Sequence, residues 1–197
     1  MKAKATFYQK RIYPIVFMFV VTVLCILITS GLYLTTQDRA VANELSFTRR
    51  AILDAGGLEY TPTTDGIEKA YLQEVTVEDG YYTAQSPEGT RYILPMQGPG
   101  LWGTIFIMVG LKEDLTTFSG LAIVSQNETP GLGARIEEPW FTAQFQGKKS
   151  PFTLVNEGTA KAPNEIDAIT GASRTSEYFR NLTNRASSDA KRIIRGE

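Results

Sequence analysis

The chain has 197 residues, of which 43% are hydrophobic, and its formal net charge at pH 7 is −1. It has no histidine and a single cysteine, Cys25, which excludes Ser-His-Asp catalysis, the usual zinc sites, and any disulfide or iron–sulfur cluster made by this chain alone. The basic residues of segment 1–11 leave the remainder acidic, and an acidic body argues against nucleic acid as a partner.

A membrane-spanning helix is predicted at 12–36. This segment carries no charge, and about 20 such residues are enough to cross the bilayer core as a helix. A cleaved signal peptide would have a shorter apolar region, of roughly 7–15 residues. The positive-inside rule places the basic segment 1–11 in the cytoplasm, so residues 37–197 are expected to form an extracytoplasmic domain at the inner or plasma membrane.

An antiparallel sheet is predicted in the first half of that domain. An apolar face over 41–55 first indicates a helix, and 60–66 has the composition of a loop. Alternating or continuously apolar runs then predict strands at 71–77, 81–84, 91–96, 104–111 and 121–124. The segment 97–100 is expected to break the sheet. Because short turns join successive strands, with helices before and after them, the fold class is predicted to be α+β.

Two helices are predicted in the second half of the domain. Residues 139–147 indicate a short helix that buries Trp140 and Phe145 in the core. Ile166 and Ile169 are expected at the end of a strand, and a longer amphipathic helix is expected from Tyr178 onward.

A glycine-rich stretch with the sequence Q-N-E-T-P-G-L-G-A-R occupies 126–135, between the sheet and the first of these helices. It offers a carboxylate, a hydroxyl, two glycines that allow close approach of the backbone to a ligand, and an apolar side chain. These groups belong to Glu128, Thr129, Gly131, Gly133 and Leu132. An ordinary connecting loop would account for the same residues.

A hydroxyl-rich turn with the sequence D-A-I-T-G-A-S-R-T-S occupies 167–176, before the last helix. A strand, a tight turn and a helix start in succession aim free backbone N–H groups and the positive end of the helix dipole at one spot, where a phosphate would be stabilised. In the alternative interpretation, Ser173 or Thr175 is only an N-cap of the helix.

Taken together, E-T-P-G-L-G at 128–133 and D-x-x-T-G-A-S-x-T at 167–175 resemble the FMN-binding domain. That domain is found in the C subunit of the sodium-translocating NADH:quinone oxidoreductase and in the G subunit of the related Rnf complex. The predicted membrane helix fits the same family, and the resemblance covers nearly the whole chain.

The resemblance implies that a flavin transferase attaches FMN covalently, through its phosphate, to a hydroxyl of the second motif. The family has threonine at the acceptor position, where this chain has Ser173, and Thr170 and Thr175 are alternative acceptors. Asp167 is expected to guide the transferase or its metal. The other residues that the resemblance places at the FMN are Gly171, Ala172, Glu128, Thr129, Gly131, Leu132, Gly133 and Trp102. No metal site is expected in the chain itself.

The expected function is therefore that of an electron-transfer subunit that is not catalytic alone. It would work with other membrane subunits in an ion-translocating NADH:quinone or ferredoxin:NAD oxidoreductase. The alternative is a membrane-anchored assembly or sensory module with a non-covalent or empty flavin site. A hydrolase using Ser173 is disfavoured, because the serine has no histidine or evident lysine base.

Overall fold

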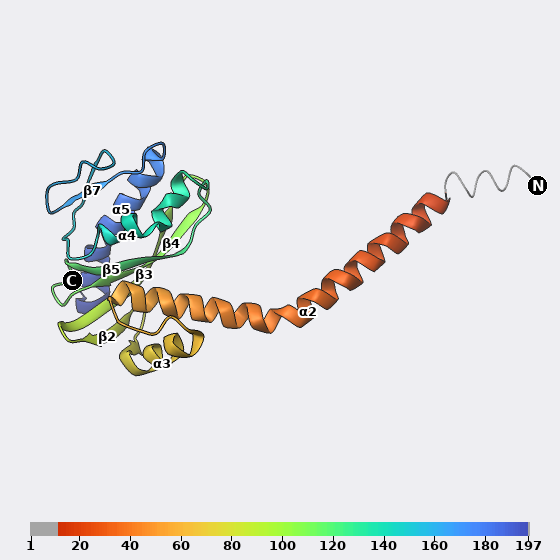
Figure 1. Cartoon of the computed structure of the whole chain (residues 1–197), viewed down its shortest axis with the longest axis horizontal. Coiled ribbons are helices and arrows are strands. Elements are labelled where there is room, and N and C mark those ends of the chain that lie inside the picture. The colour runs from red at the N-terminus through yellow and green to blue at the C-terminus, as the bar shows by residue number, and fades with distance from the viewer. Residues whose placement is uncertain (1–11, 197) are drawn as a thin grey trace, which may run out of the picture. The chain divides into compact units, whose positions relative to one another are not determined.

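The computed structural model describes residues 12–196, so the predicted cytoplasmic segment 1–11 lies outside the described residues. The chain divides into two compact units, residues 1–45 and residues 46–197. The first unit contains most of a long N-terminal helix, and the second contains the strands and the C-terminal helix (Figure 1).

The N-terminal helix, α2 (Tyr13–Gly56), is continuous and contributes residues to both units. In the described part of the chain it is the one helix that is long and apolar enough to cross a membrane, and its apolar window is not buried inside the protein. The helices predicted at 12–36 and 41–55 are thus parts of a single element, because the residues between them include neither glycine nor proline. The apolar part fits a single-pass membrane anchor.

A five-stranded antiparallel sheet forms the centre of the second unit, and its strands are neighbours in chain order. The strands are β1 (Val75–Val77), β2 (Tyr82–Ser86), β3 (Gly89–Pro99), β4 (Thr104–Leu111) and β5 (Phe118–Ser125). The apolar run predicted at 104–111 is confirmed as β4, whose last five residues are all buried. The sheet and its flanking helices confirm the predicted α+β class.

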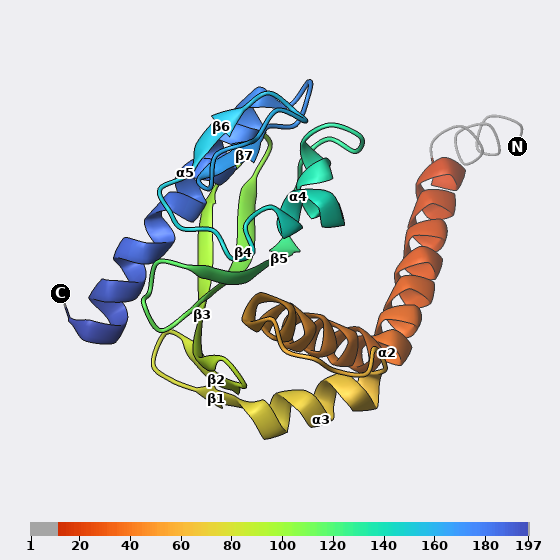
Figure 2. The same ribbon diagram turned by 60° about the vertical axis from the view of Figure 1, so that its left-hand side comes forward.

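Helices cover both faces of this sheet (Figure 2). Side chains alternate along β3, so Leu94 and Met96 join the core beneath the C-terminal helix, whereas Ile93 joins a second core beneath the last turns of α2. The C-terminal helix is α5 (Ser173–Ala190), and a short π-helical turn, η3 (Lys191–Arg195), follows it.

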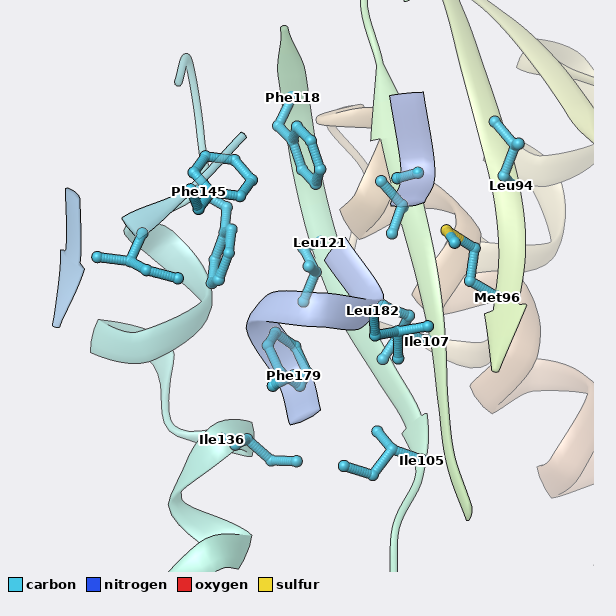
Figure 3. Close-up of a cluster of buried hydrophobic side chains, with 14 of the residues drawn as sticks. Leu94, Met96, Ile105, Ile107, Phe118, Leu121, Ile136, Phe145, Phe179 and Leu182 are labelled. Atoms are coloured by element: carbon cyan, nitrogen blue, oxygen red, sulfur yellow. The ribbon is translucent and has the colours of Figure 1, made fainter. Parts of the chain in front are cut away.

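The core beneath α5 is the larger of the two. Phe179 and Leu182 of α5 lie against the sheet, with Leu182 beside Ile107 (Figure 3). Each side chain of this size contributes about 1.5–3 kcal/mol when fully buried. The helix that follows the second motif is therefore held firmly on the sheet.

The segment between β5 and α5 supplies the rest of this layer. Its elements are η2 (a 3-10 helix, Gly133–Glu137), α4 (Pro139–Ala143), β6 (Thr153–Val155) and β7 (Glu165–Asp167). Strands β6 and β7 pair in parallel and form a separate two-stranded sheet. The sequence pattern did not predict this parallel pair.

The strand predicted at 71–77 is wrong over most of its length. Helix α3 (Thr64–Glu74) occupies this stretch and part of the predicted loop 60–66, and the Thr63 side chain caps its first turn. The alternating apolar residues also recur every fourth position, so they mark a helical face as well as a strand face. This face consists of Ile67, Tyr71 and Val75.

Two predicted strands are longer in the structure. The segment 97–100 was predicted to break the sheet, but β3 continues into it and ends at Pro99, which pairs with Thr104. Strand β5 extends beyond 121–124 at both ends. Proline is tolerated at the end of a strand, where losing one N–H donor costs little of the ladder. As a result, the β3–β4 turn lies beside the two motifs.

Both predicted helices of the second half have different bounds. Helix α4 ends at Ala143, after which turns lead to Gly147. Phe145 is fully buried, as predicted, and Trp140 is half-buried at the edge of the same core. Helix α5 begins at Ser173, well before Tyr178, so the second motif includes the helix start itself.

Candidate functional site

Three segments that are distant in sequence meet around one carboxylate at the β3–β4 end of the sheet. Glu128 is only 5% exposed, and its Oε1 accepts hydrogen bonds from the backbone N–H groups of Leu101 (2.7 Å) and Trp102 (3.1 Å). Its Oε2 accepts a hydrogen bond from the Thr175 hydroxyl, on the first turn of α5. Glu128 thus joins the β3–β4 turn to the second motif.

Two glycines leave room for this carboxylate. A Cβ atom at Gly100 would lie 2.5 Å from Oε1, and one at Gly133 would lie 2.6 Å from Oε2 and 2.8 Å from the Thr175 hydroxyl oxygen. Side chains at either position would push Glu128 away from its partners. These glycines therefore serve close packing inside the protein, although the sequence suggested that Gly133 allows approach to a ligand.

The first motif places its apolar side chain against the second. Gly131 adopts a φ of +75°, and the Thr129 carbonyl accepts from the N–H groups of Leu132 and Ala134 (3.1 Å each). Leu132 is 44% exposed, and a Cβ atom at Gly171 would lie 3.1 Å from its Cδ2. The two stretches singled out in the sequence are thus neighbours in space.

Helix α5 begins without a side-chain cap from any described residue. Its N-cap position is Ala172, and the preceding Gly171 has a φ of +81°, a conformation that favours glycine. Neither Ser173 nor Thr175 is the N-cap of the alternative interpretation, because both lie inside the helix. The amides of the first turn are thus available to an anion at the positive end of the helix dipole.

The hydroxyls of the second motif differ in accessibility. Thr170 and Ser173 are exposed, whereas Thr175 and Ser176 are almost fully buried. Thr175 donates to Glu128, and the Ser176 hydroxyl accepts from the Ile169 N–H (3.0 Å). The hydroxyls of Ser173 and Thr170 are therefore accessible from solvent, whereas that of Thr175 is not.

An ion pair fixes the turn before the helix. Glu157 accepts from the Thr170 N–H (2.7 Å) and pairs with the Arg135 guanidinium, with Nη2 2.8 Å from Oε1. Arg135 also lies over the Trp140 ring. The hydrogen bond from Arg135, together with that from Thr170, lowers the pKa of Glu157 to about 2. Nothing in the local sequence around Glu157 distinguished it, since its partners lie in other segments.

Asp167 stabilises the loop before the second motif. Its Oδ1 accepts from the N–H groups of Thr159 (2.9 Å) and Ala160 (2.8 Å), and the Gln144 side chain accepts from its backbone N–H (2.6 Å). The residue is half-buried at the end of β7. Asp167 therefore has a structural role in this chain, which is separate from the role expected toward a transferase.

Three exposed apolar side chains belong to the segments that meet at Glu128 and the second motif. Trp102 is 69% exposed, Leu101 49% and Leu132 44%, while the backbone of the first two is held by Glu128. Aromatic and aliphatic side chains of this kind can cover a planar ring, and uncapped amides can hold a phosphate. The residues present therefore fit FMN. In the described residues, no group of three or more acidic, histidine or cysteine side chains is placed to hold a metal.

Comparisons with known proteins show which proteins the chain is similar to. Residues 100–188, from the β3–β4 turn to α5, match the FMN-binding domain family. The chain is 39% identical over 149 residues to the C subunit of the Na(+)-translocating NADH-quinone reductase of Vibrio vulnificus strain YJ016. It is 38% identical over 104 residues to the C subunit of the Vibrio anguillarum enzyme. These alignments cover 72% and 49% of this chain, but 58% and 41% of the two relatives.

Two solved structures share the fold. The C subunit of the Na(+)-translocating NADH-quinone reductase from Parabacteroides distasonis gives a TM-score of 0.66 at 23% identity, covering 80% of this chain and 96% of that one. NqrC from Shewanella oneidensis gives 0.63 at 16% identity, with coverages of 73% and 90%. The chain is thus similar to C subunits of Na(+)-translocating NADH-quinone reductases, and its residues 100–188 match the FMN-binding domain family.

Proposed function

We propose that this chain is a membrane-anchored electron-transfer subunit that carries FMN covalently on Ser173. The observation that carries the proposal is the uncapped start of α5, where the exposed Ser173 lies within the matched FMN-binding region. Leu132 and Gly171 bring the first motif to the same place. The chain itself offers no histidine, and its single cysteine lies in the apolar part of α2, so the electrons would reside on the cofactor.

Each part of the site has a separate task in this proposal. The first-turn amides of α5 would stabilise the phosphate, and the side chains of Leu101, Trp102 and Leu132 would cover the ring and limit its contact with water. Bound FMN supplies the ability to accept and release electrons. The protein supplies position and electrostatic environment.

Attachment requires a nucleophilic oxygen and a second enzyme. The Ser173 Oγ would form a new P–O bond to the FMN phosphorus of FAD while the bond to the AMP half breaks. AMP leaves, and the serine proton passes to a base of the flavin transferase or to water. Serine offers the same kind of oxygen as the threonine usual in the family, so this reaction does not require threonine.

The proposed partners are the other membrane subunits of a Na(+)-translocating NADH-quinone reductase. Two C subunits of that complex are among the relatives, which favours it over the Rnf complex. Segment 1–11 would lie in the cytoplasm and the FMN-binding domain outside it, by the positive-inside rule. An assembly or sensory module without covalent flavin is the competing function.

The test is in-gel fluorescence of the full chain after denaturing electrophoresis, following incubation with FAD, Mg²⁺ and a flavin transferase. A fluorescent band whose flavin peptide contains modified Ser173 is expected. Ser173→Ala should remove the band, Ser173→Thr should keep it, and Thr170→Ala should leave it unchanged. A fluorescent Ser173→Ala protein would move the attachment to Thr170, and a dark wild-type band would favour the assembly or sensory module.

A further inference from the structure

We propose that Glu128 is a positioning residue that sets both sides of the FMN site before the cofactor arrives. One side is the β3–β4 turn with Leu101 and Trp102, and the other is the start of α5 with Ser173. The inference rests on the proposed function. It differs from the expectation that Glu128 touches the flavin, because it assigns the residue a role inside the protein.

Burial and hydrogen bonding leave Glu128 little to offer a ligand. The residue is 5% exposed, Oε1 holds two backbone N–H groups, and Oε2 holds the Thr175 hydroxyl. Because the carboxylate is buried among these groups, a flavin could bond to it only if they moved aside. The carboxylate therefore acts on the site through the groups it holds.

The charge of Glu128 strengthens these bonds. Glu128 takes part in no ion pair within residues 12–196, so the two amides, the hydroxyl and the nearby helix start are what oppose its charge. Hydrogen bonds to a charged acceptor are roughly twice as strong as neutral ones. A carboxylate in this environment holds its donors in one arrangement.

The neighbouring glycines leave just enough space for the Glu128 carboxylate. Because a Cβ atom at Gly100 or Gly133 would contact the carboxylate oxygens below 3 Å, the side chain fits only when both glycines are present. Gly100 belongs to the β3–β4 turn, and its N–H donates to the Gly103 carbonyl (2.7 Å). The turn, the carboxylate and the first motif thus form one packed unit.

This unit fixes the spacing between the exposed groups of the site. Trp102 has its backbone N–H on Oε1 while the residue is 69% exposed. Thr175 is bound to Oε2, and Ser173 lies two positions earlier on the same helical turn. A change in the length of residue 128, or the loss of the Thr175 hydroxyl, should move the Trp102 ring relative to Ser173.

Four substitutions separate the effects of side-chain length and charge at residue 128 from the effect of the hydroxyl at residue 175. Glu128→Asp keeps the charge but is too short to reach both sides, and Thr175→Val removes the donor on α5. Glu128→Gln keeps the length, because its Oε1 can still accept from the amides while its NH₂ donates to Thr175. Thr175→Ser keeps the hydroxyl, so the site should remain as in wild type, in contrast to Thr175→Val. Asp114→Ala is the control for destabilisation far from the motifs, since Asp114 accepts from the N–H groups of Thr116 and Thr117 in the β4–β5 turn.

Two measurements are made on the full chain. The first is the initial rate of covalent FMN attachment, followed by in-gel fluorescence with FAD and the transferase. The second is iodide quenching of the flavin-free protein in a Trp140→Phe background, where Trp102 is the remaining tryptophan. Glu128→Asp and Thr175→Val should slow attachment about tenfold or more and alter the quenching of Trp102, Glu128→Gln should have a smaller effect, and Thr175→Ser and Asp114→Ala should resemble wild type.

The outcomes distinguish this inference from the proposed function. Wild-type attachment rates and quenching in both Glu128→Asp and Thr175→Val would overturn the positioning role while leaving FMN attachment intact. Slowing of Asp114→Ala to the same degree would also overturn it, because the effect would then follow from general destabilisation. If wild type itself takes no flavin, the proposed function fails, but the quenching of Trp102 still decides whether Glu128 positions the turn.

Discussion

The two ends of strand β3 hold buried charges in opposite ways. At the start of β3, Arg91 is 4% exposed and pairs with Glu88, whose side chain is 67% exposed on the neighbouring turn. Among the described residues, Arg91 Nη1 has no hydrogen-bond partner, and Arg91 lines an open cavity of about 710 Å³. Beyond the other end of β3, roughly 26 Å away for an extended strand, Glu128 has partners at both oxygens.

The difference lies in what each charge is bound to. Arg91 depends on the exposed carboxylate of Glu88, which water screens and which is free to move. Glu128 depends on backbone amides and on a hydroxyl of a well-packed helix, which cannot move independently. We conclude that the end with the two motifs is built for fixed geometry, whereas the opposite end is not.

The largest effect is expected from removing the fixed carboxylate. Glu128→Ala leaves two amides and one hydroxyl without their acceptor, and each such loss costs on the order of 1–3 kcal/mol before water enters. The free energy of unfolding should fall by roughly 3 kcal/mol, measured by urea denaturation. A loss below about 1 kcal/mol would mean that water replaces the carboxylate freely and that this end is not rigid.

The next effect concerns the glycines of the first motif. Gly133→Ala places a Cβ atom against Glu128 and Thr175, so it should cost about 2 kcal/mol through overpacking. Gly131→Ala meets open space and should cost about 1 kcal/mol, because only its positive φ is strained. Thermal unfolding of the two variants side by side checks the order, and equal losses would contradict the close packing around Glu128.

A small effect is expected at the opposite end. Arg91→Met removes a buried cation that already lacks one partner and fills similar volume with apolar atoms. Stability should therefore change by no more than about 1 kcal/mol in either direction. Covalent flavin attachment should be unaffected. A large loss of stability or of attachment would show that the two ends are not separate in function.

The smallest effect is a pH dependence at the turn before α5. The pKa of Glu157 falls from its usual 4.5 to about 2 in the folded protein, so its ionised form favours folding. This contribution is fully present above pH 4.5 and is lost as the pH falls toward 2. The difference in melting temperature between wild type and Glu157→Gln should accordingly be constant above pH 4.5 and shrink below it. A difference that stays constant down to pH 2 would show that the charge of Glu157 is not involved.

Local patterns predicted the elements whose signals are unambiguous. The apolar run of β4 and the long apolar helix follow directly from composition, and the buried Phe145 follows from its place in an apolar stretch. The segment around Tyr71 fits both a helix and a strand, and only its packing against the core beneath the last turns of α2 resolves the choice. The start of α5 at Ser173 involves side-chain contacts such as the hydrogen bond from the Ile169 N–H to the Ser176 hydroxyl, which the apolar periodicity does not reveal.

Residues that the two motifs singled out are neighbours in the structure, but the contacts of some of them could not be predicted. The two motifs identified Ser173, Leu132 and Gly171, and the structure brings them together. The role of Glu128 depends on partners 26 to 47 positions away along the chain, and Glu157 depends on partners in other segments. A sequence read one segment at a time contains no sign of such bonds.

The uncapped start of α5 has a consequence for how stability and function are balanced in this fold. A serine or aspartate at an N-cap contributes about 1 kcal/mol by accepting from first-turn amides. At Ala172 the chain forgoes that gain, and the same amides remain free to meet a cofactor phosphate. The flavin-free domain is thus less stable than it would be with a capping residue at position 172. The phosphate of the covalent cofactor would take the place of the missing cap. Under the proposed function, maturation and thermal stabilisation would be one event.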